Sequence, residues 1–114
     1  MAYDYEFLKV TKSGRLAEVV ISNPPINIIT IPLYMELSQL TIELKADDEL
    51  TVVVFKSADP DFFLAHFDVS AILEFPTDVE AQHDPEMSLY HAMCERVRTM
   101  NKVTIAQILS LIHI

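Results

Sequence analysis

Aromatic and polar side chains alternate near the amino terminus in a pattern that predicts a β-strand over residues 3–10. Residues 16–22 are rich in β-branched side chains, which favour strands. Gly14 lies between the two stretches, where a tight turn can use a glycine with positive φ. We therefore expect the two strands to form an antiparallel hairpin.

Leucines repeat at alternating spacings of four and three residues in the next segment, which predicts a helix with one apolar face. The members of this stripe are Leu33, Leu37, Leu40 and Leu44. Thr30 precedes the stripe as a suitable N-cap, and Pro32 fits the first helical turn. The helix is expected to run to about Ala46.

A continuous run of β-branched residues, Thr51 to Phe55, is typical of a strand that is covered on both faces. Asp68 is a suitable cap for a short helix through Leu73, and residues 84–86 predict the start of another helix. Residues 103–108 predict a second buried strand. The order is hairpin, helix, strand, short helix, helix, strand, which indicates an α/β fold with an incomplete parallel sheet.

The helix predicted after residues 84–86 has an apolar stripe of its own. Its members are Met87, Tyr90, Cys94 and Val97. We interpret Cys94 and the methionines Met87, Met93 and Met100 as residues that fill the core. Cys94 is the only cysteine, so the sequence contains neither an intrachain disulfide nor a cysteine-built zinc site.

Composition narrows the classes of function. The 114 residues, 51% of them apolar, suffice for one core, and no stretch reaches the ~18 apolar residues of a membrane span. The net charge is −9, and residues 46–95 hold twelve acidic residues and one base, Lys56, which disfavours nucleic acid as a partner. The single glycine excludes the glycine-rich nucleotide-binding motifs.

The opening residues lack the basic and apolar layout of a secretory signal or transit peptide, so we expect a cytoplasmic protein. The histidines have no metal-ligand spacing, so no metal site is expected.

Four stretches follow one another in a distinctive order. They are Asn23-Pro-Pro-Ile-Asn27, the leucine helix, Leu50-Thr-Val-Val-Val-Phe55 and Phe63-Leu-Ala-His-Phe-Asp68. In this order they resemble the crotonase superfamily, the enoyl-CoA hydratase/isomerase family, and residues 101–108 are similar to the next strand of that family. The resemblance covers about residues 5–108.

The resemblance implies the amino-terminal half of a crotonase-like ββα spiral core. It makes residues 1–108 a partial acyl-CoA-binding domain and residues 109–114 an apolar tail that need not be native sequence. The chain would then be a fragment of an acyl-CoA enzyme about twice as long, which stabilises a thioester enolate through a backbone oxyanion hole. The implied partner is an acyl-CoA thioester, with coenzyme A as part of the substrate and no separate cofactor. The intact protein is expected to form a homo-oligomer, a trimer or hexamer.

The family motif assigns candidate roles to single residues. Ala65 stands where the family uses a backbone N–H as oxyanion donor, and a fixed backbone donor suits a charge that develops during reaction. The candidate substrate-binding residues are Ile26, Ala65, His66, Phe67 and Asp68. His66 and Phe67 replace a small glycine and alanine of the family, so we expect a narrowed or repurposed pocket.

Each role has a structural alternative. Ala65 can be a small packing residue and Asp68 a helix N-cap, and His66 with Asp68 is either a base with its orienting partner or a loop histidine beside a cap. The second oxyanion donor and the catalytic glutamates of the family follow the matched region, so we expect the 114 residues alone to be inactive. The basic residues that would meet the coenzyme A phosphates are left open: they are Lys9, Lys12, Lys45, Arg96, Arg98 or Lys102, or they belong to the missing half of the enzyme. A different class of function is a non-catalytic interaction or oligomerisation domain that uses an open sheet edge.

Overall fold

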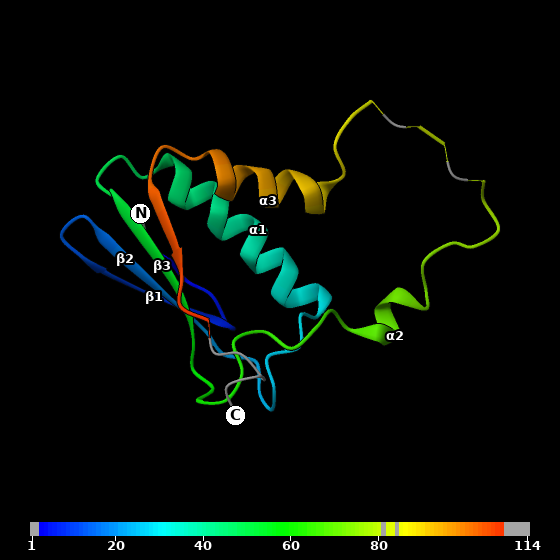
Figure 1. Cartoon of the computed structure of the whole chain (residues 1–114), viewed down its shortest axis with the longest axis horizontal. Coiled ribbons are helices and arrows are strands. Elements are labelled where there is room, and N and C mark those ends of the chain that lie inside the picture. Colours follow the sequence, from blue (N-terminus) through cyan, green and yellow to red (C-terminus); the bar gives the residue numbers. More distant parts are fainter. Residues whose placement is uncertain (1–2, 81, 84, 109–114) are drawn as a thin grey trace.

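The computed structural model describes residues 3–80, 82–83 and 85–108. In chain order the elements are β1 (Leu8–Ser13), β2 (Leu16–Ile21), α1 (Ile31–Ala46), β3 (Val52–Ser57), α2 (Val69–Ile72), α3 (Leu89–Thr99) and β4 (Val103–Ala106). This is the predicted order of a hairpin, a helix, a strand, a short helix, a helix and a strand. Figure 1 shows α1 and α3 together beside the sheet, with α2 near the start of α1, on the side away from the sheet.

The four strands form one sheet in the order β1-β2-β3-β4. β1 and β2 are antiparallel, with Val10 opposite Val19, and the predicted hairpin is confirmed. β2, β3 and β4 are parallel to one another, as expected for strands joined by helical crossovers. Gly14 has a φ of +60° in the hairpin turn, which is the left-handed conformation that favours glycine.

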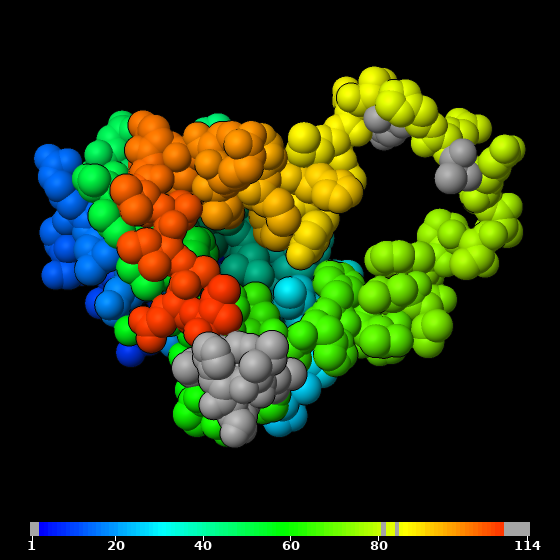
Figure 2. Space-filling view, in the orientation of Figure 1, coloured from blue at the N-terminus to red at the C-terminus, as the bar shows by residue number. Residues whose placement is uncertain are grey.

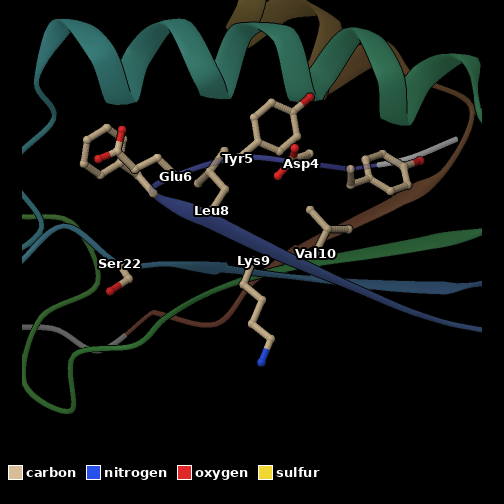
Figure 3. Close-up of a pocket in the computed structure, with 9 residues that line it drawn as sticks. Asp4, Tyr5, Glu6, Leu8, Lys9, Val10 and Ser22 are labelled. Carbon is tan, nitrogen blue, oxygen red and sulfur yellow. The ribbon is translucent and has the colours of Figure 1, made fainter.

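The first strand is shorter than predicted, because residues 3–7 lie outside the sheet and are held against α1. The Tyr3 hydroxyl donates to the Asp47 carboxylate at 2.6 Å, and the Tyr5 hydroxyl donates to Glu43 at 2.7 Å. Figure 3 shows Tyr5 turned toward α1 and Lys9 pointing away from it, around a hollow of about 230 Å³. The alternating aromatics therefore reflect packing along a helix rather than strand pairing.

Helix α1 begins and ends where the sequence predicts. The Thr30 hydroxyl accepts from the Leu33 N–H at 3.3 Å as the N-cap. Its leucine stripe faces β1, β2 and β3, and Leu37 is the member that is only partly buried. The buried core consists of Leu8, Ala17, Val19, Ile21, Leu33, Leu40, Leu44, Leu50, Val53 and Met100.

The last helix, α3, starts later than predicted, and the predicted inward face is confirmed only in part. Its N-cap is Ser88, whose hydroxyl accepts from the His91 N–H at 3.3 Å, and residues 84–86 do not start it. Val97 of the predicted stripe packs against the core. Met93 and Met100 are buried as predicted, whereas Cys94 and Met87 are exposed. The core-filling role proposed for Cys94 and Met87 is therefore wrong.

Strand β4 is also more exposed than predicted. Val103 and Ile105 keep 55% and 46% of their surface accessible, so the interpretation of a buried strand is wrong in this structure. β4 pairs only with β3 in the described part of the chain, which leaves its outer edge open. Residues 109–114, predicted to be an apolar tail, lie outside the described residues. No helix in the described ranges is both long and apolar enough to cross a membrane.

Candidate functional site

Two loops meet at one edge of the sheet because the strands that precede them are parallel. The loop after β2 and the loop after β3 leave the sheet in the same direction, and Ile29 and Phe67 pair as an isolated parallel bridge between them. The Ile29 N–H donates to the His66 carbonyl at 2.8 Å, and the Asp68 N–H donates to the Ile29 carbonyl at 2.9 Å. The carboxyl ends of parallel strands are the usual place for ligand sites in α/β folds.

Ala65 lies in this loop pair and is half-buried. Its N–H donates to the Asn27 carbonyl at 3.3 Å, which is longer than the usual 2.9–3.0 Å. In this structure the amide therefore faces a backbone oxygen of the neighbouring loop rather than open space. A ligand oxygen would have to share the Ala65 N–H with the Asn27 carbonyl or displace that carbonyl. The oxyanion-donor role of Ala65 stays a prediction.

Asn27 joins the two loops, although the family motif assigns it no candidate role. Its side chain is buried and contacts the end of β2, the end of β3 and the loop that carries Ala65. Its backbone adopts the left-handed conformation, with a φ of +56°. Asparagine tolerates this conformation better than most residues, and its position after a Pro-Pro turn was the signal that could have found it.

His66 and Asp68 make separate contacts. The His66 Nδ1 lies 2.7 Å from the Phe67 carbonyl, and the Asp68 carboxylate accepts from the Ser70 hydroxyl at 2.6 Å and from the Ser70 N–H at 3.0 Å. Asp68 is thus the N-cap of α2, as the structural alternative predicted, and these bonds lower the pKa of its carboxyl group. Across the described ranges, no hydrogen bond joins His66 to Asp68.

An apolar pocket of about 480 Å³ opens next to the loop pair. It lies between the start of α1, the short helix α2 and the start of α3, which Figure 1 shows at the same end of the molecule. The lining residues are Ile31, Tyr34, Phe67, Ile72, Phe75 and Tyr90. Burial raises the pKa of Tyr90, whose ring centroid lies 5.6 Å from that of Tyr34. The volume and the aromatic lining are typical of small-molecule pockets.

Phe67 is the predicted site residue that lines this pocket. Ile26 is half-buried in the loop after β2, and neither it nor His66 contributes to the pocket wall. The structure therefore brings Ala65, His66, Phe67 and Asp68 to one loop beside an apolar cavity, with Ile26 on the neighbouring loop. The larger side chain at Phe67, expected to narrow a pocket, forms one wall of this cavity.

Several of the basic residues that are candidates for phosphate binding already bond to other groups of the protein. Lys12 forms ion pairs with Asp47 and Glu49, both at 3.0 Å. The Arg96 guanidinium donates to the Thr41 hydroxyl at 2.8 Å, and Arg98 pairs with Glu95. Lys9, Lys45 and Lys102 have no ion pair with any described carboxylate, so they are the better candidates for a phosphate. No group of three potential metal ligands occurs among the residues that the structure describes.

The fold is similar to solved structures of larger proteins. A candidate enoyl-CoA hydratase from Streptomyces avermitilis superposes with a TM-score of 0.71 and 31% identity, over 90% of this chain and 38% of that one. DspI from Pseudomonas aeruginosa superposes with a TM-score of 0.67 and 27% identity, over 94% of this chain and 40% of that one. An enoyl-CoA hydratase from Bacillus anthracis superposes with a TM-score of 0.72 and 15% identity, over 92% of this chain and 40% of that one. At this identity the likeness is one of fold alone.

The chain thus spans about 40% of the length of these structures. No protein-family model and no curated protein matches the sequence.

Proposed function

Since this chain belongs to the crotonase superfamily and has the amino-terminal half of its fold, we propose that it is the acyl-CoA-binding half of an enoyl-CoA hydratase/isomerase-type protein. The substrate would be an acyl-CoA thioester, and coenzyme A would enter as part of it. Trimeric or hexameric assembly of the whole protein and its cytoplasmic location stay predictions.

The position of Phe67 carries the proposal. Phe67 lines the apolar pocket and lies two residues after Ala65, so one short loop supplies both a backbone donor and a wall of the cavity. An acyl thioester has the matching parts, a carbonyl oxygen next to an apolar chain. The chain would enter the pocket between α1, α2 and α3 while the thioester group lies against residues 65–67.

The backbone at Ala65 would act on the thioester oxygen. This oxygen gains negative charge when an enolate forms, and a fixed N–H stabilises that charge without loss of side-chain freedom. The amide would have to exchange the Asn27 carbonyl, 3.3 Å away, for the thioester oxygen. The carboxylate of this segment, Asp68, already caps α2, so we expect the 114 residues to bind thioesters without turning them over.

Titration calorimetry tests the proposal with butanoyl-CoA, octanoyl-CoA and free coenzyme A. We expect octanoyl-CoA to bind tightest, because burial of each additional methylene is worth about 0.8 kcal/mol. Ile72→Trp, which fills the pocket, should weaken octanoyl-CoA binding by about tenfold or more, in line with the ~1–3 kcal/mol cost of overpacking.

Val69→Trp is the matched control, since Val69 lies on the same helix, is exposed and does not line the pocket. It should leave the affinity unchanged. Equal binding of octanoyl-CoA and free coenzyme A, or equal loss in both variants, would contradict the proposal.

A second candidate function rests on the open edge of β4. Val103 and Ile105 are exposed on this strand, and its outer backbone groups have no strand partner in the described ranges. Such an edge can pair with another chain, which would make the protein an interaction or oligomerisation domain. Size-exclusion chromatography with light scattering separates the two functions. A defined dimer or trimer without affinity for acyl-CoA favours the second.

A further inference from the structure

We infer that Asn27 is the positioning residue of the site, which fixes the segment Phe63–Ala65 and with it the direction of the Ala65 N–H. The inference deepens the proposed function and rests on it for the thioester. It stands on six hydrogen-bond contacts that converge on one buried residue.

The side-chain amide of Asn27 reaches three separate parts of the chain. Its Nδ2 lies within hydrogen-bond distance of three acceptors, the Ile21 carbonyl at 3.2 Å, the Ser57 hydroxyl at 2.6 Å and the Phe63 carbonyl at 3.0 Å, so two of them share one of its two protons. Ile21 ends β2 and Ser57 ends β3, so the amide links both strand ends to the candidate loop. Only 2% of the residue is exposed, so solvent competes little for these bonds.

The remaining polar atoms of Asn27 are also used. Its Oδ1 accepts from the Asn23 N–H at 2.7 Å, and its own N–H donates to the Asn23 carbonyl at 2.9 Å. Its carbonyl accepts from the Ala65 N–H at 3.3 Å. The Phe63 carbonyl and the Ala65 N–H therefore both bond to Asn27, one to the side chain and one to the backbone. These two bonds bracket Leu64 and set the plane of the peptide group that carries the Ala65 N–H.

The chemistry of the position selects asparagine. A φ of +56° favours glycine, asparagine and aspartate, but glycine has no side chain to span the loops. Aspartate has the same size, yet its carboxylate cannot donate to the Ile21 and Phe63 carbonyls. Asparagine alone combines the backbone conformation with an acceptor and two donor protons.

Amide hydrogen exchange by NMR of the ligand-free chain tests the geometric part. In Asn27→Asp we expect exchange at Ala65 to accelerate by about tenfold or more relative to Val53 in β3, because the loss of buried hydrogen bonds lowers local stability. Asn23→Ala is the matched control. It removes an amide from the same loop whose donated bond, to the Ile28 carbonyl at 2.8 Å, stays within that loop, so Ala65 should keep its protection.

If Asn27→Asp also loses protection at Val53, Ser57→Ala provides the second test. It removes one partner of Asn27 and should accelerate exchange at Ala65 more than at Val53. Unchanged exchange at Ala65, relative to Val53, in the variants that fold would overturn the inference.

The positioning part is tested by the ratio of affinities for octanoyl-CoA and for S-octyl-CoA, a thioether that lacks the carbonyl oxygen. We expect the wild-type chain to prefer the thioester by about tenfold, and Asn27→Asp to lose this preference while Asn23→Ala keeps it. A role in folding alone would weaken both ligands equally. No preference in the wild-type chain contradicts the proposed oxyanion donor, whereas a preference that survives in folded Asn27→Asp contradicts the role of Asn27.

Discussion

The two ends of the molecule differ in how completely they are packed. The sheet strands β1 to β3 and helix α1 share a closed core in which Leu33, Leu40 and Leu44 are fully buried. The part around α2 and the connection to α3 exposes large apolar side chains instead. These are Val69, Ile72, Leu73, Phe75, Val79, Met87 and Leu89. Figure 2 shows the connection from α2 standing apart from the body of the molecule.

This contrast separates stability from function. The closed core holds the strand ends in place, and the loops that leave those ends carry Asn27 and Ala65. The open end supplies α2 and Phe67, which shape the pocket. Substitutions in the core should therefore change the free energy of unfolding, while substitutions at the open end should change ligand binding with little effect on folding.

The largest expected effect compares two leucines. Leu40→Ala should destabilise the chain by about 3 kcal/mol, because the removal of a fully buried leucine leaves a cavity. Leu73→Ala, at a side chain that is 78% exposed, should change the free energy of unfolding by less than about 0.5 kcal/mol. Urea unfolding followed by circular dichroism measures both. Equal losses in the two variants would show that the open end is packed in solution.

A smaller effect concerns Asp47, the C-cap residue of α1, which accepts hydrogen bonds from Tyr3 and Lys12. Hydrogen bonds from the Tyr3 hydroxyl, from Lys12 and from the Glu49 N–H lower the pKa of its carboxyl group to about 2. Because the folded pKa lies below the unfolded value of about 4, the stabilisation is complete above about pH 5 and is lost as the pH falls toward 2. Asp47→Asn should cost about 1–2 kcal/mol at pH 7.

Urea unfolding of both proteins from pH 7 to pH 2 measures this difference. The difference should shrink steadily below pH 4, where Asp47 binds a proton in the unfolded chain but not yet in the folded one. A difference that is constant over this range would contradict the assigned bonds. Asp68→Asn is the control at the open end, where the lowered pKa belongs to the cap of a single-turn helix and a smaller loss is expected.

The smallest effect compares two helix caps. Thr30→Ala should cost about 1 kcal/mol, because it removes the acceptor for the Leu33 N–H at the start of a helix that is part of the core. Ser88→Ala removes the corresponding bond to the His91 N–H at the more exposed start of α3. We expect a smaller change in the unfolding midpoint for Ser88→Ala, and an equal or larger change would show that α3 contributes to the core as strongly as α1 does.

Local patterns predicted the fold well where one physical rule dominates. The leucine spacing with its Thr30 cap located α1, and the β-branched run located β3. The strand predicted from the alternation of residues 3–7 does not form, because Tyr3 and Tyr5 bond to residues in and at the end of α1. Such tertiary contacts are not contained in any local pattern. The predicted start of α3 at residues 84–86 was wrong, because the N-cap is Ser88, whose hydroxyl accepts from the His91 N–H.

The candidate site was predicted only in part. The family resemblance found the segment from Ala65 to Asp68, and the structure places Phe67 in a pocket wall. The resemblance did not predict that the Ala65 N–H donates to the Asn27 carbonyl, because that hydrogen bond joins residues 38 positions apart in the sequence. Asn27 itself was seen as part of a motif, and its contacts to three segments emerge only when the loops are folded together.

The structure of the chain in complex with octanoyl-CoA tests the central claim most directly. We predict that the thioester oxygen lies within about 3 Å of the Ala65 nitrogen, that the Ala65 bond to the Asn27 carbonyl is lengthened or lost, and that the octanoyl chain lies against Phe67. A thioester bound elsewhere, with the Ala65 N–H still donating to Asn27, would contradict the account.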